Sequence, residues 1–327
     1  MKISILTATY NRADFLPRLY KSIINNEEHE LEIEWLIMDD GSQDNTKEVV
    51  QKIIEDSSSN SKNSNYNSKE INKNNIEIKY NYQENRGKME ALNNLMQYVT
   101  GDLIVDCDSD DYFSKNAFKI IEDEFKKEPK SEGKYAICFL KQKENGQTDG
   151  TNFKNETSTM FDLYFKEGTT GEKNLVYYAD IRKKYKHETE KNEKFITEAR
   201  MYHKMDKDYK IKCINKAITI GEYQENGYTS NIQKTFIESP NGYYKYFEEI
   251  LEKDFKGVTF NKRLYAIKHF ILFTVLTNQK LTTKKVKNIL NKIIIRILYW
   301  PGKIKSRQLK NKINISSEKT QKKGNKS

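Results

Sequence analysis

The chain has 327 residues, with 57 Lys and Arg against 47 Asp and Glu and a net charge of +10 at pH 7. This length allows one domain of about 230 residues with a smaller appendage. Fifteen basic residues and one acid, Glu318, fall in residues 279–327, so that segment carries +14 and residues 1–278 carry −4. Because the basic excess lies in the tail and not on the body, the charge pattern speaks against a nucleic-acid-binding fold, and we expect no nucleic-acid partner.

Cysteine usage and the start of the chain indicate a cytoplasmic protein. Cys107, Cys138 and Cys213 are scattered, without the paired spacing of a disulfide framework or the spacing of metal ligands. Such usage is typical of a reducing compartment. The first residues read as a strand, with no basic region leading into an apolar segment, so we expect no secretion signal.

The first 55 residues alternate strands and helices. Residues 3–12 predict a strand and a polar turn, and residues 13–24 an apolar-periodic helix. A second apolar strand at 35–38 runs into the acidic turn 39–42, and a helix follows at about 45–55. Strands that alternate with helices predict a parallel sheet with right-handed crossovers. Residues 57–75 are poor in apolar side chains, and we expect a disordered insertion there, before a strand at 76–82.

The apolar strand at 103–105 ends abruptly in a cluster of carboxylates. The cluster consists of Asp106, Asp108, Asp110 and Asp111. Open α/β folds build ligand sites at the carboxyl edge of the sheet, and clustered carboxylates repel one another unless a cation neutralises them. Oxygen ligands on a short turn suit Mg²⁺ or Mn²⁺ holding a diphosphate. The alternative is that Asp108 and Ser109 only cap the helix that begins near Ser114.

Three predicted strands therefore end in polar side chains that should meet at one edge of the sheet: Thr9 and Asn11, Asp39 and Asp40, and Asp108 and Asp110. At this point the sequence resembles the family-2 glycosyltransferases, nucleotide-sugar enzymes of the GT-A fold. The resemblance lies in four motifs that keep the family's order and spacing: TATYNR (7–12), MDDGSQDNT (38–46), ENRGKMEALN (84–93) and GDLIVDCDSDD (101–111).

The resemblance implies roles for these residues. Asp40 would hydrogen-bond the nucleotide base, and Lys88 would lie near the phosphates. Asp108 and Asp110 would be the acids of the DXD motif and hold Mn²⁺ or Mg²⁺, with Asp110 as the direct ligand. The rest of the nucleotide-sugar site would comprise Thr7, Ala8, Thr9, Tyr10, Asn11, Arg12, Asn85, Asn93 and Ser109. Ala8 departs from the pattern, because relatives commonly carry Pro there, but that turn contributes backbone contacts.

An inverting transfer, which the family uses, also needs a base that takes the proton of the attacking hydroxyl. Relatives carry an acidic pair at the start of a helix; this chain has Thr197 in the first place and keeps Glu198 in the second, so Glu198 is the candidate base. The alternative is that Glu198 only complements the dipole of the helix. Arg200 and His203 follow it, either facing the acceptor or lying on the helix surface. A polar loop at 223–231 either closes over the donor diphosphate or is a plain surface loop.

Beyond the polar loop, we expect a helix pair at about 261–277 and 282–300, of which the second helix lies in the basic segment 279–327. Residues 286–300 alternate apolar and basic positions at helical spacing and end in Tyr299 and Trp300, as interfacial helices on an anionic leaflet do. The longest uncharged apolar stretch, 270–277, is far shorter than the roughly 20 residues that a membrane span needs. The alternative is that both helices simply pack on the catalytic domain.

The sequence thus predicts an α/β protein of the GT-A type, a Rossmann-like, mostly parallel sheet flanked by helices with a C-terminal helical appendage. We expect a catalytic domain at 1–235, the appendage at 236–302 and a basic disordered tail at 303–327. The expected activity is metal-dependent, inverting transfer from a nucleotide-diphosphate sugar, UDP-linked, to a saccharide or lipid-linked acceptor, in surface polysaccharide synthesis at the inner face of the cell membrane. The alternatives are an inactive GT-A domain that serves as a membrane-bound scaffold, and a nucleotidyltransferase; the latter should carry a glycine-rich phosphate loop, which TATYNR lacks.

Overall fold

The computed structural model describes residues 1–324 except 27, 63–75, 129–130 and 222–231. Within these residues, side chains are described except at 59–62, 232–233 and 309–324. The contacts divide the chain into two compact units. The first comprises residues 1–188 and 201–227, and the second comprises residues 189–200 and 228–327.

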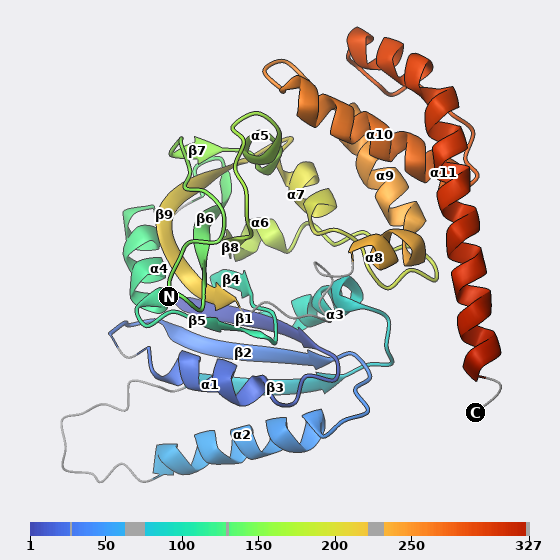
Figure 1. Cartoon of the computed structure of the whole chain (residues 1–327). Helices are drawn as coiled ribbons and strands as arrows, with labels where there is room; N and C mark the ends of the chain where they lie inside the picture. The colour runs from blue at the N-terminus through green and yellow to red at the C-terminus, as the bar shows by residue number, and fades with distance from the viewer. Residues whose placement is uncertain (27, 63–75, 129–130, 222–231, 325–327) are drawn as a thin grey trace. The chain divides into compact units, whose positions relative to one another are not determined.

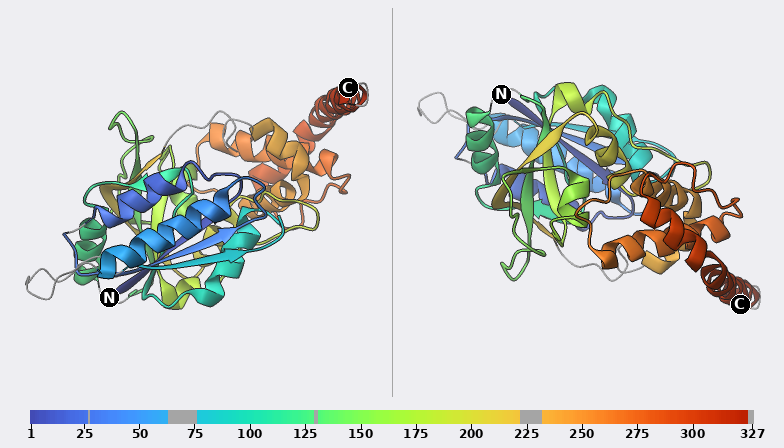
Figure 2. Two further views of the ribbon diagram at one scale, coloured as in Figure 1. Left: turned by 90° about the horizontal axis from the view of Figure 1, so that it is seen from below. Right: turned by 90° about the horizontal axis from the view of Figure 1, so that it is seen from above.

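The N-terminal half of the first unit is a parallel α/β layer (Figure 1). Its strands are β1 (Lys2–Thr9), β2 (Glu32–Asp39), β3 (Ile76–Tyr82) and β4 (Leu103–Asp106), in the spatial order β3-β2-β1-β4 and all parallel. Its helices are α1 (Leu16–Ile24), α2 (Thr46–Lys62), α3 (Lys88–Leu95) and the short 3-10 helix η1 (Met96–Tyr98). The helices α1 and α2 cover one face of these strands and α3 packs on the other (Figures 1 and 2), which explains the nearly continuous apolar runs of β1 and β2.

Beyond β4 the sheet is mixed. The remaining strands are β5 (Asp111–Phe113), β6 (Lys134–Lys143), β7 (Thr157–Ser158), β8 (Lys173–Tyr178) and β9 (Lys210–Gly221), and the helices are α4 (Ala117–Lys127), α5 (Met160–Phe165), α6 (Ala179–Arg182) and α7 (Ala199–Met205). The order continues β4-β8-β6-β9-β5, with β7 on β9, and among these pairs β6 and β9 are parallel and the others antiparallel. The predicted α/β class is confirmed, but the sheet is less parallel than expected: its strands are parallel from β3 to β4 and in the β6–β9 pair, and antiparallel in the other pairs.

One carboxylate is buried within the parallel layer and is held there by several partners. Glu34 on β2 is fully buried and accepts hydrogen bonds from the Ser4 hydroxyl, from the Thr100 hydroxyl (2.6 Å) and from the Thr100 amide (2.7 Å). Lys2 forms an ion pair with it at 3.1 Å. Burial alone would raise the pKa of Glu34, but these hydrogen bonds and Lys2 outweigh it and lower the pKa to about 2. The carboxylate is therefore charged and fully partnered inside the fold.

The second unit is helical. It contains α8 (Ile232–Glu238), α9 (Pro240–Leu251), α10 (Phe260–Leu276) and α11 (Ile289–Gly324). Stacked and edge-on aromatic rings fill the space between α9 and α10, with Tyr243 and Phe247 of α9 against Phe273 of α10. α11 packs along α10 and continues past it (Figures 1 and 2).

Two predicted disordered segments are partly helical. Residues 57–62 continue α2, whereas the insertion was expected to begin at Ser57; residues 63–75 lie outside the described residues. The expected disordered tail at 303–327 is helical as far as Gly324, since Lys, Gln and other good helix formers follow Pro301 with no further proline and no glycine from 303 to 323. In the described part of the chain, no helix combines the length and the hydropathy needed to cross a membrane.

Candidate functional site

The three polar turns meet at one edge of the sheet. β2, β1 and β4 are neighbours and run parallel, so the residues that follow Asp39, Thr9 and Asp106 leave the sheet at the same edge. The hydrogen bonding between β4 and β1 continues one residue past Asp106, because the Cys107 amide donates to the Leu6 carbonyl at 2.9 Å. The predicted convergence of the three turns is confirmed.

The turns after β1 and β2 are tied to each other by Asn11. Its amide donates to the Ser42 hydroxyl at 2.9 Å, and its side-chain oxygen accepts from the Gln43 amide at 2.8 Å. The backbone of Asn11 has φ +51°, in the left-handed region that Asn tolerates better than most residues. This asparagine therefore fixes the geometry of the TATYNR turn.

Asp40 anchors the loop that precedes α3. Its side chain is buried, with 4% of its surface exposed, and its Oδ1 accepts from Gln83 Nε2 at 2.7 Å and from the Arg86 amide at 2.8 Å. Its Oδ2 accepts from the Gly87 amide at 2.8 Å. Gly41 lets the loop come close, because its φ is +83° and an added Cβ would lie 2.8 Å from the Asn85 amide nitrogen. Asp40 thus holds residues 83–87 against the end of β2.

Lys88 joins this loop to the acidic turn. It is the first residue of α3, and its Nζ lies 2.6 Å from Asp108 Oδ1. Both side chains are partly exposed, at 22% and 43%. The ENRGKMEALN and GDLIVDCDSDD motifs, which are separate in the sequence, therefore meet through one ion pair. The proposal that Asp108 serves only as a helix cap does not account for this contact.

Asp110 and Asp111 sit in different electrostatic surroundings. Burial and the neighbouring Asp108 raise the pKa of Asp110 above its usual value. Burial also raises the pKa of Asp111, but this carboxylate is paired with Lys141 of β6, with 2.7 Å between Oδ2 and Nζ, and Lys141 also contacts Glu172 at 2.7 Å. Sequence analysis missed Lys141, although a single lysine at the end of the buried run 135–140 was a visible signal.

The acidic turn fits a divalent cation bound with a ligand. No cluster of three or more His, Cys, Asp or Glu side chains arranged to hold a metal occurs among the described residues. Mg²⁺ and similar ions, however, are commonly held by one or two carboxylates plus substrate phosphates and water. The charge of Asp108 contributes to the raised pKa of Asp110, although burial of Asp110 is the larger cause, so the two carboxylates lie close enough to interact. Asp108 and Asp110 therefore suit such an ion.

The family model of glycosyl transferase family 2 matches residues 4–186, more than half of the chain. The chain belongs to glycosyl transferase family 2. The transferase is 34% identical over 124 residues to an uncharacterised glycosyltransferase of Mycoplasma genitalium, a match that covers 37% of the chain and 36% of the relative. It is 30% identical over 128 residues to the poly-β-1,6-N-acetyl-D-glucosamine synthase of Staphylococcus aureus, covering 39% of the chain and 26% of the relative. The matches thus span about a third or less of these relatives.

Solved structures support the GT-A fold of the transferase. The S. aureus TarS 1–349 complex with UDP-GlcNAc superposes with a TM-score of 0.52 at 17% identity, covering 94% of the chain and 79% of TarS. The mannosyltransferase PcManGT of Pyrobaculum calidifontis, in complex with GDP-Man and Mn²⁺, gives a TM-score of 0.50 at 13% identity. The match covers 93% of the chain and 83% of PcManGT. At these identities the likeness concerns the fold alone.

The other residues predicted for the nucleotide-sugar site of the transferase differ in exposure. Tyr10 is exposed, Arg12 and Ala8 are half-buried, and Ser109 is buried. Thr7 accepts from Trp35 Nε1 at 3.0 Å.

Two buried oxygens, Thr9 Oγ1 and Asn85 Oδ1, have no hydrogen-bond partner within the described residues. The side-chain amide of Asn93 donates to the His187 carbonyl and accepts from the His187 backbone amide, at 2.9 Å each. Asn93 therefore holds the backbone at His187 in place.

Glu198 belongs to the second unit of the transferase. It is half-buried and stands immediately before α7, within residues 189–200.

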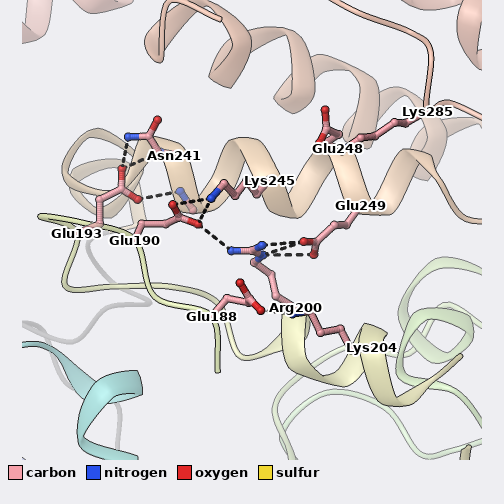
Figure 3. Close-up of polar contacts among 11 residues, drawn as sticks. Glu188, Glu190, Glu193, Arg200, Lys204, Asn241, Lys245, Glu248, Glu249 and Lys285 are labelled. Carbon is pink, nitrogen blue, oxygen red and sulfur yellow. Dashed lines mark hydrogen bonds and ion pairs between the residues drawn. The ribbon is translucent and has the colours of Figure 1, made fainter. Parts of the chain in front are cut away.

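The neighbouring Arg200 is only 3% exposed and forms a forked ion pair with Glu249 of α9, with 2.7 Å from Nη2 to Oε1 and 3.2 Å from Nε to each oxygen (Figure 3). Glu190 contacts Arg200 at 3.2 Å and Lys245 at 2.7 Å. The helix-surface interpretation of Arg200 and His203 is therefore wrong, because both are buried.

A second carboxylate fixes the same segment to α9. Glu193 accepts from the amides of Asn241 and Gly242 at 2.7 Å each, and from the Asn241 side chain at 2.8 Å (Figure 3). These amides belong to the first turn of α9, which lacks intrahelical acceptors, so Glu193 caps the helix. The polar loop predicted at 223–231, with Tyr223, Asn226 and Ser230 as its candidate contacts to the donor, lies outside the described residues.

Proposed function

We propose that this transferase moves a sugar from a nucleotide-diphosphate sugar, UDP-linked, to an acceptor hydroxyl, with a divalent cation and with inversion at the anomeric carbon. The contact that carries the proposal is the 2.6 Å ion pair between Lys88 and Asp108. The Lys88 ammonium group thus lies beside Asp108, one of the two acids proposed for the DXD motif, at the end of the loop that Asp40 holds. Positive charge at a carboxylate turn suits a diphosphate with its cation.

In this proposal Asp108 and Asp110 hold Mn²⁺ or Mg²⁺. Such an ion stabilises the negative charge that develops on the leaving diphosphate. Lys88 adds a second positive charge at the same place. Asp40 hydrogen-bonds the nucleotide base while it keeps residues 83–87 in position, and Thr9 and Asn85 offer their unpartnered buried oxygens to the donor.

Glu198 is the proposed general base. As the acceptor oxygen bonds to the anomeric carbon, the bond from that carbon to the diphosphate oxygen breaks, and the acceptor proton passes to the Glu198 carboxylate. The acid position that the chain shares with family-2 relatives supports this role, and so does its place just before α7.

The biological proposal is surface polysaccharide synthesis at the inner face of the cell membrane, with a saccharide or lipid-linked acceptor. The similarity to the S. aureus poly-β-1,6-N-acetyl-D-glucosamine synthase supports a polysaccharide product. The TarS complex with UDP-GlcNAc supports a UDP-linked donor, and the PcManGT complex supports Mn²⁺.

The deciding experiment is a screen of nucleotide sugars for hydrolysis in Mn²⁺ or Mg²⁺, which needs no acceptor, together with calorimetric titration of UDP plus Mn²⁺. We expect one UDP-sugar to be hydrolysed and UDP binding to require the cation. Hydrolysis that persists unchanged in excess chelator would overturn the metal assignment. A chain that neither binds UDP nor hydrolyses any donor would be the inactive scaffold.

A further inference from the structure

The C-terminal helix carries an exposed apolar stripe. On α11, five large apolar side chains are each between 47% and 73% exposed: Ile289, Ile293, Ile297, Trp300 and Ile304. They follow one another at spacings of three and four residues. Since an α-helix turns by about 100° per residue, all five fall within an arc of roughly 80°. Leu290, also exposed, widens the stripe on one side.

The opposite face of α11 packs inside its own unit. Asn291 and Ile295 are fully buried, and Ser306 is nearly so. Arg263 of α10 donates to Asn288 at 2.9 Å and to Asn291, and an added Cβ on Gly302 would lie 2.8 Å from Ile271 of α10. This packed face points roughly 180° away from the stripe. The stripe is therefore not the seam that joins α11 to α10.

Basic residues border the stripe. Lys292, Arg296 and Lys303 follow one side of it, and Arg307 stands at its end. Lys303 Nζ lies over the rings of Tyr299 and Trp300, at 5.5 Å and 5.1 Å from their centroids. The sequence contains no acid from 279 to 317. An apolar stripe that ends in Trp, beside a border of Lys and Arg, matches a helix lying in the plane of an anionic lipid surface.

We propose that this stripe, defined by Ile289, Ile293, Ile297, Trp300 and Ile304, docks the protein on an anionic membrane surface. Charge decides between lipid and a second copy of the chain. Two such stripes could pair as a coiled coil, but their Lys and Arg borders would then face each other without a compensating acid. A leaflet with anionic headgroups instead supplies the opposite charge. The proposal concerns binding and stands independently of the proposed catalytic function.

The 327-residue chain offers a built-in probe of the docked face. The chain contains two tryptophans, of which Trp35 is fully buried in the first unit and Trp300 is 66% exposed. We expect the emission of Trp300 to shift to the blue with vesicles of phosphatidylcholine and phosphatidylglycerol, and to be quenched by brominated lipid. Vesicles of phosphatidylcholine alone should bind much more weakly, and added salt should weaken binding to the anionic vesicles.

The decisive variant is the double substitution Ile297→Gln and Trp300→Gln. Both positions are exposed, so the helix should remain folded, while co-sedimentation with anionic vesicles should fall at least about tenfold. Phe260→Gln is the matched control, because Phe260 is 60% exposed in the same unit but lies on α10. Trp300→Phe should keep vesicle binding and lose the fluorescence shift.

Several outcomes would overturn the proposal. One is an intact chain that stays in the supernatant with anionic vesicles at low salt. Another is a double variant that sediments with vesicles as the intact chain does. A third is a chain whose stripe substitutions convert a dimer to a monomer without changing vesicle binding, which would assign the stripe to a second copy. UDP-sugar hydrolysis, measured on the same samples, reports separately on the catalytic proposal.

Discussion

The first unit and helix α11 of the second unit use their charged residues in opposite ways. In the first unit, carboxylates such as Glu34 and Asp40 turn inward and are held by several hydrogen bonds each, leaving the acidic turn at Asp108 and Asp110 at the sheet edge. On α11 of the second unit, basic side chains stand beside exposed apolar ones. The first unit thus partners its buried carboxylates internally, whereas α11, as far as its side chains are described, presents a face with no partner in its own unit.

The largest effect should come from the acidic turn. If Asp110 ligates the cation, Asp110→Asn should abolish sugar transfer and metal-dependent UDP binding, since the neutral amide is a poor ligand for a hard cation. Thermal unfolding should be almost unchanged. Asp123→Asn, which alters an exposed carboxylate on α4, is the matched control. Wild-type activity and metal dependence in the Asp110 variant would remove the DXD assignment.

A smaller but still large effect should follow at the proposed base. Glu198→Gln should lower turnover by roughly 10² to 10⁴, the usual worth of general-base catalysis, while UDP and cation bind with near-normal affinity. Steady-state kinetics and calorimetry on the same preparation test this. Equal losses of donor binding and turnover would point to a structural role. Glu188→Gln, a carboxylate that pairs with Lys204, serves as the control.

The inward carboxylate of the first unit should make stability depend on acid pH. The folded-state pKa of Glu34 is about 2, below the ordinary 4.5, so its contribution is complete above pH 4.5 and is lost as pH falls towards 2. The shift corresponds to about 3 kcal/mol. Urea unfolding should show Glu34→Gln destabilised by about that amount near neutral pH, and the gap should close on acidification. A gap that stays constant with pH would contradict the assignment.

The smallest effect should come from the ion pair that holds residues 189–200. Glu249→Gln keeps one acceptor for Arg200 and leaves Glu190 in place, so we expect a loss of about 1–2 kcal/mol in unfolding free energy. Glu249→Ala should cost more, because it removes every contact of Arg200 to this side chain. The exposed Glu238→Gln is the control. A Glu249→Ala variant as stable as the control would mean that the pair contributes nothing.

The sequence was most informative where the chemistry is local. The turns at 9–12, 39–42 and 106–111 were predictable, because each follows directly on an apolar strand and carries its own motif. The roles that depend on distant partners were not. Arg200 looked like a surface residue because its partner Glu249 lies on another helix, and the pairing of Lys141 with Asp111 required knowing that β6 and β5 both flank β9.

Element ends and strand directions were also hard to predict beyond the motifs. β8 runs antiparallel to β4, which no apolar pattern in residues 173–178 could indicate. The last helix was predicted at about 282–300, whereas α11 runs from Ile289 to Gly324 and contains Pro301. The Lys-rich residues that follow Pro301 are good helix formers.

The path of residues 189–200 has a consequence for how the protein is made. The chain leaves the first unit after residue 188, contributes this segment to the second unit, and returns at residue 201. On the ribosome, Glu193 and Arg200 emerge before α9, which carries the amides of Asn241 and Gly242 and the carboxylate of Glu249. Domains tend to fold as units in order of synthesis. Here the segment that carries Glu198 must wait for α9, so the proposed base is positioned only after most of the chain has been translated.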